Sequence, residues 1–379
     1  MEGRPYTLRQ LLAYFLRLGT LGFGGPVALV GAMERDLVQE RGWISADEYK
    51  QGLTLAQLAP GPLAAQLGIY MGYVHHGAVG ATLAGLAFIL PSFLMVVAFG
   101  ALYLHFGGLP VIQALFYGIG AAVIGLIARS AWKLGQRTLG SDPAAWTIAG
   151  LVMAATLLMQ RELVWFFLGG GAALWFLRAR PKPAAAAGLP LGLVGVFAAG
   201  HPDWPLLGRL GLFFAKAGAF VFGSGLAIVP FLYAGVVHEH RWLTERQFLD
   251  AVAVAMITPG PVVITVAFIG FLVAGLPGAC VAALATFLPC WCFTVLPAPY
   301  LRRHGARPGV KVFVDGVTAA AVGAIAGAVV LLGRRILVDL PTVAMALATL
   351  LLLWRYKKLP EPLIIAGAGL LGFLLKTWI

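Results

Sequence analysis

The chain has 379 residues, of which 60% are hydrophobic and 11% are charged, and its formal net charge is +12. About a quarter of the residues of an ordinary soluble domain are charged, so this composition excludes a soluble globular protein. Apolar segments of roughly 20 residues recur without the alternation of a β-barrel, which predicts an all-α polytopic membrane protein embedded in the lipid bilayer. The positive charge suits the short loops of such a protein, so no nucleic-acid partner is expected.

The apolar segments form two sets of six. We predict the membrane elements of the first half near residues 8–31, 50–73, 77–104, 110–134, 143–160 and 162–177. We predict those of the second half near residues 207–232, 247–272, 276–300, 308–333, 339–354 and 361–378. The N-terminal stretch lacks a small-residue cleavage site, so we expect it to insert as the first element and not to be removed as a signal peptide.

The two sets are copies of one another. A shift of 199 residues places Pro60-Gly61-Pro62 on Pro259-Gly260-Pro261 and Trp43 on Trp242, and a shift of 198 continues the match to Pro143 and Pro341. A match over roughly 100 residues with one gap indicates a tandem duplication. We therefore divide the chain into an N-terminal repeat (1–180), a linker with a short extra apolar stretch (181–205) and a C-terminal repeat (206–379).

The basic loops predict that the two repeats are inverted. Lys133 and Arg137 follow the fourth element of the first half, whereas Arg302 and Arg303 follow the third element of the second half. Lys and Arg mark the cytoplasmic side, so these loops share a side only if the second half is flipped. Inverted repeats with broken helices are typical of secondary transporters. The sequence leaves open whether each broken element spans the membrane or re-enters.

Each half contains two predicted helix breaks. Pro-Gly-Pro at 60–62 and 259–261 removes backbone donors, and the glycine-rich stretches 22–26 and 222–225 let the chain leave helical geometry. A helix that restarts there presents unpaired N–H groups, which form an anion site without a charged side chain. The predicted site consists of these backbone and polar residues: Gly24, Gly25, Pro60, Gly61, Gln66, Gly223, Ser224, Gly225, Thr258, Pro259, Gly260 and Thr265.

The alternative is that the glycines and prolines only kink the helices for packing, with the threonine hydroxyls bonded to their own backbone. Four breaks in symmetric register favour the functional interpretation.

Two cations accompany the breaks at equivalent repeat positions, Arg17 and Lys216. Each lies among apolar residues, roughly 14 Å along its predicted helix and so near the middle of a hydrocarbon core about 30 Å thick. We expect both to be buried and to face the anion. The alternative is that both side chains extend to the membrane interface.

Other chemistry is less well supported by the sequence. Glu34, Glu40, Glu239 and Asp250 are candidates for proton coupling or, alternatively, belong to amphipathic loops. Cys280, Cys290 and Cys292 fit packing better than a metal site. No catalytic or nucleotide-binding motif stands out, so we expect neither an enzyme nor a cofactor or resident metal, and we give a membrane-embedded enzyme a remote place among the alternatives.

Several longer motifs resemble those of the chromate ion transporter family in its long, two-domain form. They are Phe-Gly-Gly-Pro at 23–26, Gly-Trp-Ile-Ser at 42–45, Gln-Leu-Ala-Pro-Gly-Pro at 57–62, Ala-Phe-Ile-Leu-Pro-Ser-Phe at 87–93, Phe-Gly-Ser-Gly-Leu-Ala-Ile-Val-Pro at 222–230 and Ile-Thr-Pro-Gly-Pro-Val at 257–262. Leu29 stands where the family often has His, and Pro289-Cys290-Trp291 replaces its Pro-Ser-Phe.

The resemblance covers nearly the whole chain. It implies a multi-pass transporter that exports chromate across the bacterial inner membrane and confers chromate resistance, with sulfate as a related ligand. Uptake of sulfate or another oxyanion is the alternative, and the sequence leaves a homodimer open.

Overall fold

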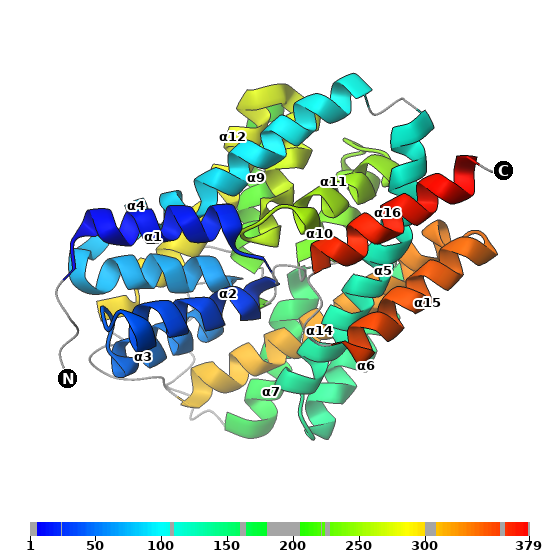
Figure 1. The fold of residues 1–379 in the computed structure, drawn as a ribbon. Coiled ribbons are helices and arrows are strands. Elements are labelled where there is room, and N and C mark those ends of the chain that lie inside the picture. Colours follow the sequence, from blue (N-terminus) through cyan, green and yellow to red (C-terminus); the bar gives the residue numbers. More distant parts are fainter. Residues whose placement is uncertain are drawn as a thin grey trace.

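The structure is a computed structural model of an all-helical chain (Figure 1). It describes residues 6–23, 25–106, 110–159, 164–179, 205–220, 222–223, 228–299, 308–356 and 361–377. The predicted linker with its extra apolar stretch, residues 181–205, lies outside the described residues except at its last position.

The helices follow the predicted segments closely. In the first half they are α1 (Leu8–Leu21), α2 (Gly25–Met33), the π-helix η1 (Glu34–Glu40), α3 (Ala46–Leu58), α4 (Leu63–Phe106), α5 (Pro110–Thr138), α6 (Pro143–Met159) and α7 (Val164–Ala179). In the second half they are α9 (Leu206–Phe220), α10 (Ile228–Tyr233), the π-helix η4 (Ala234–Glu239), α11 (Glu245–Ile257), the 3₁₀ turn η5 (Val262–Ile264), α12 (Thr265–Val295), α14 (Pro308–Ile336), α15 (Leu340–Arg355) and α16 (Glu361–Thr377). Two short strands, β1 (Gly61–Pro62) and β2 (Phe222–Gly223), lie at helix breaks.

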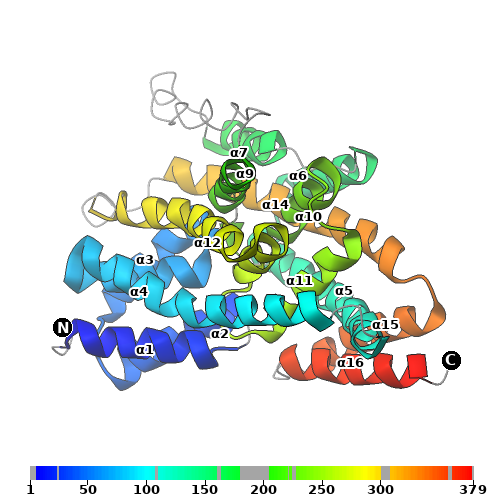
Figure 2. The same ribbon diagram turned by 90° about the horizontal axis from the view of Figure 1, so that it is seen from above.

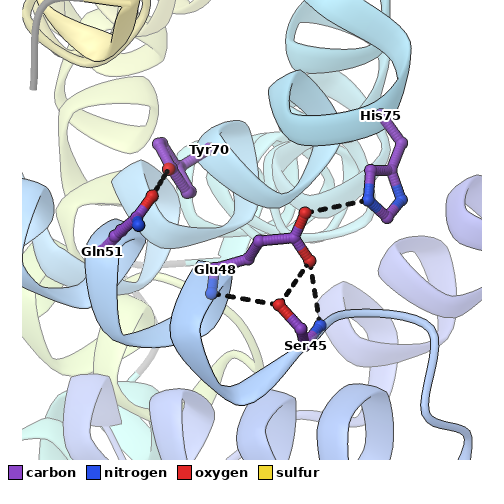
Figure 3. Close-up of polar contacts among 5 residues, drawn as sticks. All are labelled: Ser45, Glu48, Gln51, Tyr70 and His75. Carbon is purple, nitrogen blue, oxygen red and sulfur yellow. Dashed lines mark hydrogen bonds and ion pairs between the residues drawn. The ribbon is translucent and has the colours of Figure 1, made fainter. Parts of the chain in front are cut away.

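The Pro-Gly-Pro break of the first half turns the chain back on itself. Ser45 and Glu48 form a capping box that starts α3, and Glu48 also contacts His75 near the end of the following helical segment, at 3.1 Å. One turn further on, the Tyr70 hydroxyl donates to Gln51 at 3.5 Å. From the first pair to the second, the residue number rises along α3 and falls along the following helix, so the two helices are antiparallel (Figure 3). The predicted segment 50–73 is therefore an antiparallel hairpin with Pro-Gly-Pro at its tip.

The glycine break of the first half makes a second hairpin. The Tyr6 ring stacks on Trp43 at 5.2 Å between ring centres. A Cβ on Gly22 would lie 2.5 Å from the Leu29 side chain. Both contacts show that α2 and η1 return along α1. The second half repeats this arrangement, because Phe213 on α9 stacks on Phe231 of α10 at 5.4 Å. The predicted segments 8–31 and 207–232 are thus pairs of helices that fold back.

Each long helix α4 and α12 also folds at a glycine. Gly77 (φ 60°, ψ −156°) and Gly275 (φ 61°, ψ −153°) have a backbone conformation that favours glycine, and they sit at equivalent repeat positions. Gly72 packs on the Gly80 carbonyl so closely that a Cβ would lie 2.3 Å away. We call residues 63–76 and 78–106 the first and second arms of α4, and residues 265–273 and 276–295 those of α12.

The two halves interlock. α4 lies beside α12 (Figure 2). The Trp291 indole donates to Thr82 across these two helices at 3.1 Å. α6 and α7 of the first half pack on α14, whereas α15 and α16 of the second half pack on α5. Small residues allow these contacts, since a Cβ on Gly118 would lie 1.9 Å from the Ala368 carbonyl oxygen. α1–α3 gather at one end of the molecule and α15–α16 at the other (Figure 1).

The surface of the chain is that of a membrane protein. Four helical segments of the described chain are long and apolar enough to cross a bilayer: Leu63–Phe106, Gln113–Lys133, Val262–Val295 and Asp315–Arg334. Large apolar side chains are open on the outside, with Leu158 85% and Leu340 82% exposed. In water such a surface would be unfavourable, whereas lipid tails solvate it.

Candidate functional site

The helix breaks of the two halves pair crosswise. Gly61 and Pro62 of the first half pair in parallel with Phe222 and Gly223 of the second. Reciprocally, the Gly260 N–H of the second half donates to the Gly22 carbonyl of the first at 2.8 Å. We call these two pairings the crossed breaks. The Pro-Gly-Pro tip of each half thus meets the glycine break of the other half, and both tips lie in the same region of the molecule.

Glycine at the centre of each tip is required by the backbone and by the packing. Gly61 has φ +142° and Gly260 has φ +98°, which L-residues with a side chain rarely adopt. A Cβ on Gly260 would lie 2.0 Å from the Ser92 Oγ, and one on Gly61 would lie 3.1 Å from the Cys290 Sγ. A side chain at either position would strain the backbone. At Gly260 it would also collide with the Ser92 hydroxyl, whereas at Gly61 it would first meet the flexible Gln66 side chain, at 2.7 Å.

Ser92 and Cys290 occupy equivalent repeat positions beneath the two tips. The buried Ser92 hydroxyl donates to the Pro259 carbonyl at 2.7 Å and lies 3.3 Å from the Gly19 carbonyl. Cys290 is fully buried beside Gly61. Sequence reasoning did not assign these residues to the site, although Ser92 lies in the motif at 87–93 and Cys290 is its repeat counterpart.

The polar side chains at the tips are mostly bonded to backbone. The Gln66 amide donates to the Pro60 carbonyl at 2.7 Å, and its buried Oε1 has no hydrogen-bond partner among the described residues. The Thr258 hydroxyl donates to Val254 O and the Thr265 hydroxyl to Val262 O, both at 2.7 Å. For the two threonines, the alternative that their hydroxyls satisfy their own backbone is confirmed.

The expected pair of buried cations is not what the structure places at the site. Lys216 on α9 is half-buried, but Arg17 on α1 is exposed. The reason is the rotation of α1, which packs on α4 through the face that carries Phe15, Leu18 and Gly19. Arg17 falls on another face of the helix, and its guanidinium makes no hydrogen bond or ion pair with the described residues.

Lys216 lies near the loop that follows η4. Burial, together with the positive charges of Arg209 and Lys216, holds the pKa of His240 below its usual range, against the opposing effect of Glu239. His240 stacks on Trp242 at 4.3 Å. In the first half the equivalent pair is Arg41 over Trp43, at 4.6 Å from the ring centre. Lys216 therefore adds a positive potential beside this loop, and it lies about one turn before the end of α9.

All four expected helix restarts are present. α2 begins at Gly25, α4 at Leu63, α10 at Ile228 and α12 at Thr265 after η5. Three of the predicted site residues, Gly24, Ser224 and Gly225, lie outside the described residues. The N-termini of α2 and α4 carry the positive end of a helix dipole and N–H groups without partners inside the helix. At the start of α12 the Thr265 N–H is instead bonded within η5, to the Val262 and Val263 carbonyls. This arrangement can hold an oxyanion by backbone donors with one nearby cation.

The site carries no cluster of metal ligands in the described part of the chain, where no group of three or more His, Cys, Asp or Glu side chains comes together. The hydrogen-bond donors available to a ligand there are backbone N–H groups and the Lys216 ammonium, and both suit an anion better than a metal ion. The unpaired Gln66 Oε1 is an acceptor and does not contribute to anion binding.

Comparison with known proteins identifies the family. The family model described as chromate transporter matches residues 9–175 and again residues 208–373. The chain belongs to the chromate transporter family. The two matched regions fall in the two repeats, one in each. Membership in a family of transporters also decides against the membrane-embedded enzyme among the alternatives.

Several full-length relatives carry matching names. The chain is 62% identical over 377 residues to the chromate transport protein of Cupriavidus metallidurans, covering 97% of this chain and 93% of the relative. It is 58% identical to the probable chromate transport protein of Synechococcus elongatus, covering 97% and 95%. It is 33% identical to the chromate transport protein of Pseudomonas aeruginosa, covering 98% and 93%. No solved structure matches the chain.

Proposed function

We propose that this transporter exports chromate across the bacterial inner membrane as a secondary transporter and thereby confers chromate resistance. The names of its full-length relatives supply the substrate. The crossed breaks are the observation that carries the mechanism, because broken helices in a membrane are tolerated where their backbone lines a polar site.

Chromate is a tetrahedral dianion, and we place it where the breaks cross. Backbone N–H groups at the starts of α2 and α4 would donate to its oxygens, with Gly25 and Gly223 beside them. Gly24, Ser224 and Gly225, which the sequence assigns to the same site, lie outside the described residues. The crossed breaks also include the backbone of Pro60, Gly61, Pro259 and Gly260. The side chains next to them are those of Gln66, Thr258 and Thr265. Lys216 would compensate one charge from beside the site, and Arg17 would contribute to the potential from the surface of α1.

The reciprocal pairing also supports inverted repeats and alternating access. Two copies of one unit that exchange equivalent contacts are related by a two-fold axis, and an axis in the membrane plane makes the two tips approach from opposite sides. Closing one pair of hairpins while opening the other would then expose the anion to each side in turn.

Inversion is tested by the sides on which the two helix turns lie. Val79 and Leu276 are exposed next to the Gly77 and Gly275 turns. In a background without native cysteines, we expect a membrane-impermeant maleimide added to intact cells to label only one of V79C and L276C. Equal labelling of both from one side would contradict inversion.

The anion site is tested by removing its two predicted cations together. In vesicles containing the double variant R17Q/K216Q, we expect chromate flux to fall to background while the protein still purifies as a folded species. The double variant R9Q/R209Q is the matched control, since it removes two exposed cations from the same helices. Full flux in R17Q/K216Q would contradict the role of these cations.

Sulfate is the second candidate, because it has the same shape and charge as chromate. Competition in the same vesicles measures this directly: inhibition of chromate flux by sulfate makes it a shared ligand, and flux in right-side-out against everted vesicles gives the direction. Chromate that does not move in either orientation would contradict the proposed function. A homodimer remains a hypothesis that the mass of the purified particle tests.

A further inference from the structure

Asp250 is the one acidic or basic side chain that is buried in the described part of the chain, with 5% of its surface exposed. Three other acidic residues that the sequence offered as proton-coupling candidates, Glu34, Glu40 and Glu239, are exposed. Asp250 lies on α11, about two turns before the Thr258-Pro259-Gly260 tip. It therefore belongs to the hairpin that forms half of the crossed breaks.

The Asp250 carboxylate bonds to the opposite half of the chain. The Tyr103 hydroxyl, on the second arm of α4, donates to its Oδ2 at 2.7 Å. The Tyr103 ring is fixed by Phe268 of α12 and Phe116 of α5, at 5.7 and 5.9 Å between ring centres. The charged or titratable groups that act on the carboxylate are Tyr103 from α4 and the exposed Arg246 from its own helix. No cation of the described chain forms an ion pair with it.

The second arm of α4 holds the α11 hairpin at two points. Tyr103 holds Asp250, and Ser92 on the same arm holds the Pro259 carbonyl at the tip. The separations along the two segments are similar, roughly 16 Å from residue 92 to 103 and roughly 13 Å from residue 250 to 259. Asp250 and the Pro259 carbonyl at the crossed break are thus both bonded to the same helical arm.

A buried carboxylate with a single hydroxyl donor is a group whose charge is expensive to keep. The equivalent residue of the first half is Gln51, which is neutral and exposed. The second half thus places an ionisable group where the first half has none. Asp250 is buried, has one hydrogen-bond donor and lies on the hairpin that forms the site. A carboxyl group in such a position is suited to take up and release a proton.

We propose that Asp250 is a proton-binding site whose occupancy is coupled to anion binding at the crossed breaks. In the ionised state the carboxylate accepts the Tyr103 hydrogen and repels a dianion. Binding of one proton converts it to a neutral carboxyl group, which removes that repulsion. Proton and dianion therefore favour one another, and by linkage each raises the affinity for the other by the same factor.

The first measurement does not depend on the substrate. Infrared difference spectra of the purified protein, recorded as the pH is raised, should lose the band of a protonated carboxyl group in a non-aqueous environment. The same band should be missing in D250N and present in D47N, which removes the exposed aspartate of the corresponding first-half helix. A wild-type spectrum without this band, or a band that persists in D250N, would overturn the proposal.

The second measurement rests on the proposed chromate transport. We expect the chromate dissociation constant of the wild type to fall about tenfold more than that of D250N between about pH 8 and about pH 6, with weakly buffered protein taking up protons as chromate binds. Chromate's own protonation is common to both proteins, so the difference between them isolates Asp250. The D47N control should match the wild type.

Equal pH dependence in D250N and the wild type would overturn the coupling. Absence of chromate binding in the wild type would instead contradict the proposed function, and the infrared result would still decide the proton site. In Y103F the transition should move to higher pH, because the ionised carboxylate loses its donor. An unchanged midpoint in Y103F would also count against the proposal.

Discussion

The first-half tip at Gly61 and the second-half tip at Gly260 both need a glycine at the same repeat position but have different support. Under Gly260, a serine hydroxyl bonds to the tip carbonyl, whereas under Gly61 the equivalent position is a cysteine whose Sγ packs against the tip. Asp250 and Gln51 differ in the same way along the two hairpins. The duplication therefore preserves the path of the chain and lets the side chains of each half specialise.

The largest test of this comparison replaces the two tip glycines. We expect G260A to abolish chromate transport, because a left-handed backbone costs an L-residue at least about 1–2 kcal/mol and its Cβ would collide with Ser92. G61A should retain some flux, because its Cβ meets the flexible Gln66 side chain first. Transport by purified variants in proteoliposomes measures both.

G150A is the matched control for these variants, since Gly150 lies on α6 with open space around it. Equal loss in G61A and G260A would show that the two tips are equivalent in function, and wild-type flux in G260A would contradict the role of the crossed breaks.

The second test compares the two cations. We expect K216Q to reduce chromate transport about tenfold and R17Q about threefold, because the half-buried charge is screened less by solvent than the exposed one. Initial rates at several chromate concentrations separate binding from turnover. A larger effect of R17Q would place the anion nearer to the outer face of α1 than the crossed breaks suggest.

The third test concerns the supports beneath the tips. We expect S92A to destabilise the protein by about 1–2 kcal/mol, because it leaves the buried Pro259 carbonyl without its donor. C290A should cost about 1 kcal/mol, since it removes packing alone. Thermal unfolding in detergent compares them, with S92C expected between S92A and the wild type. A greater loss in C290A than in S92A would reverse the proposed difference between the tips.

The sequence predicted those features that the backbone itself requires. Pro-Gly-Pro and the glycine stretches gave the positions of all four helix restarts, and the repeat gave their equivalence. The crosswise pairing was not predictable, because Gly61 and Phe222 are far apart in the chain and both lie in breaks without a pattern of their own.

The orientation of Arg17 was missed because the prediction used only the depth of this residue along its helix. α1 is amphipathic, with Leu11, Phe15 and Leu18 on its packed face and Arg9 and Arg17 exposed, so helical periodicity was the signal that could have placed Arg17 away from the packed face. Ser92 was part of a motif, but a serine in an apolar helix more often bonds to its own backbone. Its bond to Pro259 depends on the interlocking of the halves, which no local pattern encodes.

The smallest effect that we expect is on the pH dependence of stability. It concerns the position where the first half has Arg41 stacked on Trp43 and the second half has His240 stacked on Trp242. Arg41 on Trp43 stays charged at all accessible pH, whereas the pKa of His240 beside Trp242 is lowered by burial and by Arg209 and Lys216. A lowered folded pKa stabilises the protein above the unfolded value of about 6.5, and this contribution is lost as the pH falls through the folded pKa.

Thermal unfolding scans from about pH 8 to about pH 5 should therefore show a loss of stability on acidification that is smaller in H240Q than in the wild type. K216Q should also reduce this loss, because removing a nearby cation returns the pKa of His240 toward its ordinary value, whereas H105Q, which changes an exposed histidine, should not. Parallel acid losses in H240Q and the wild type would mean that the histidine stack does not respond to pH and that the two halves differ here in residue type alone.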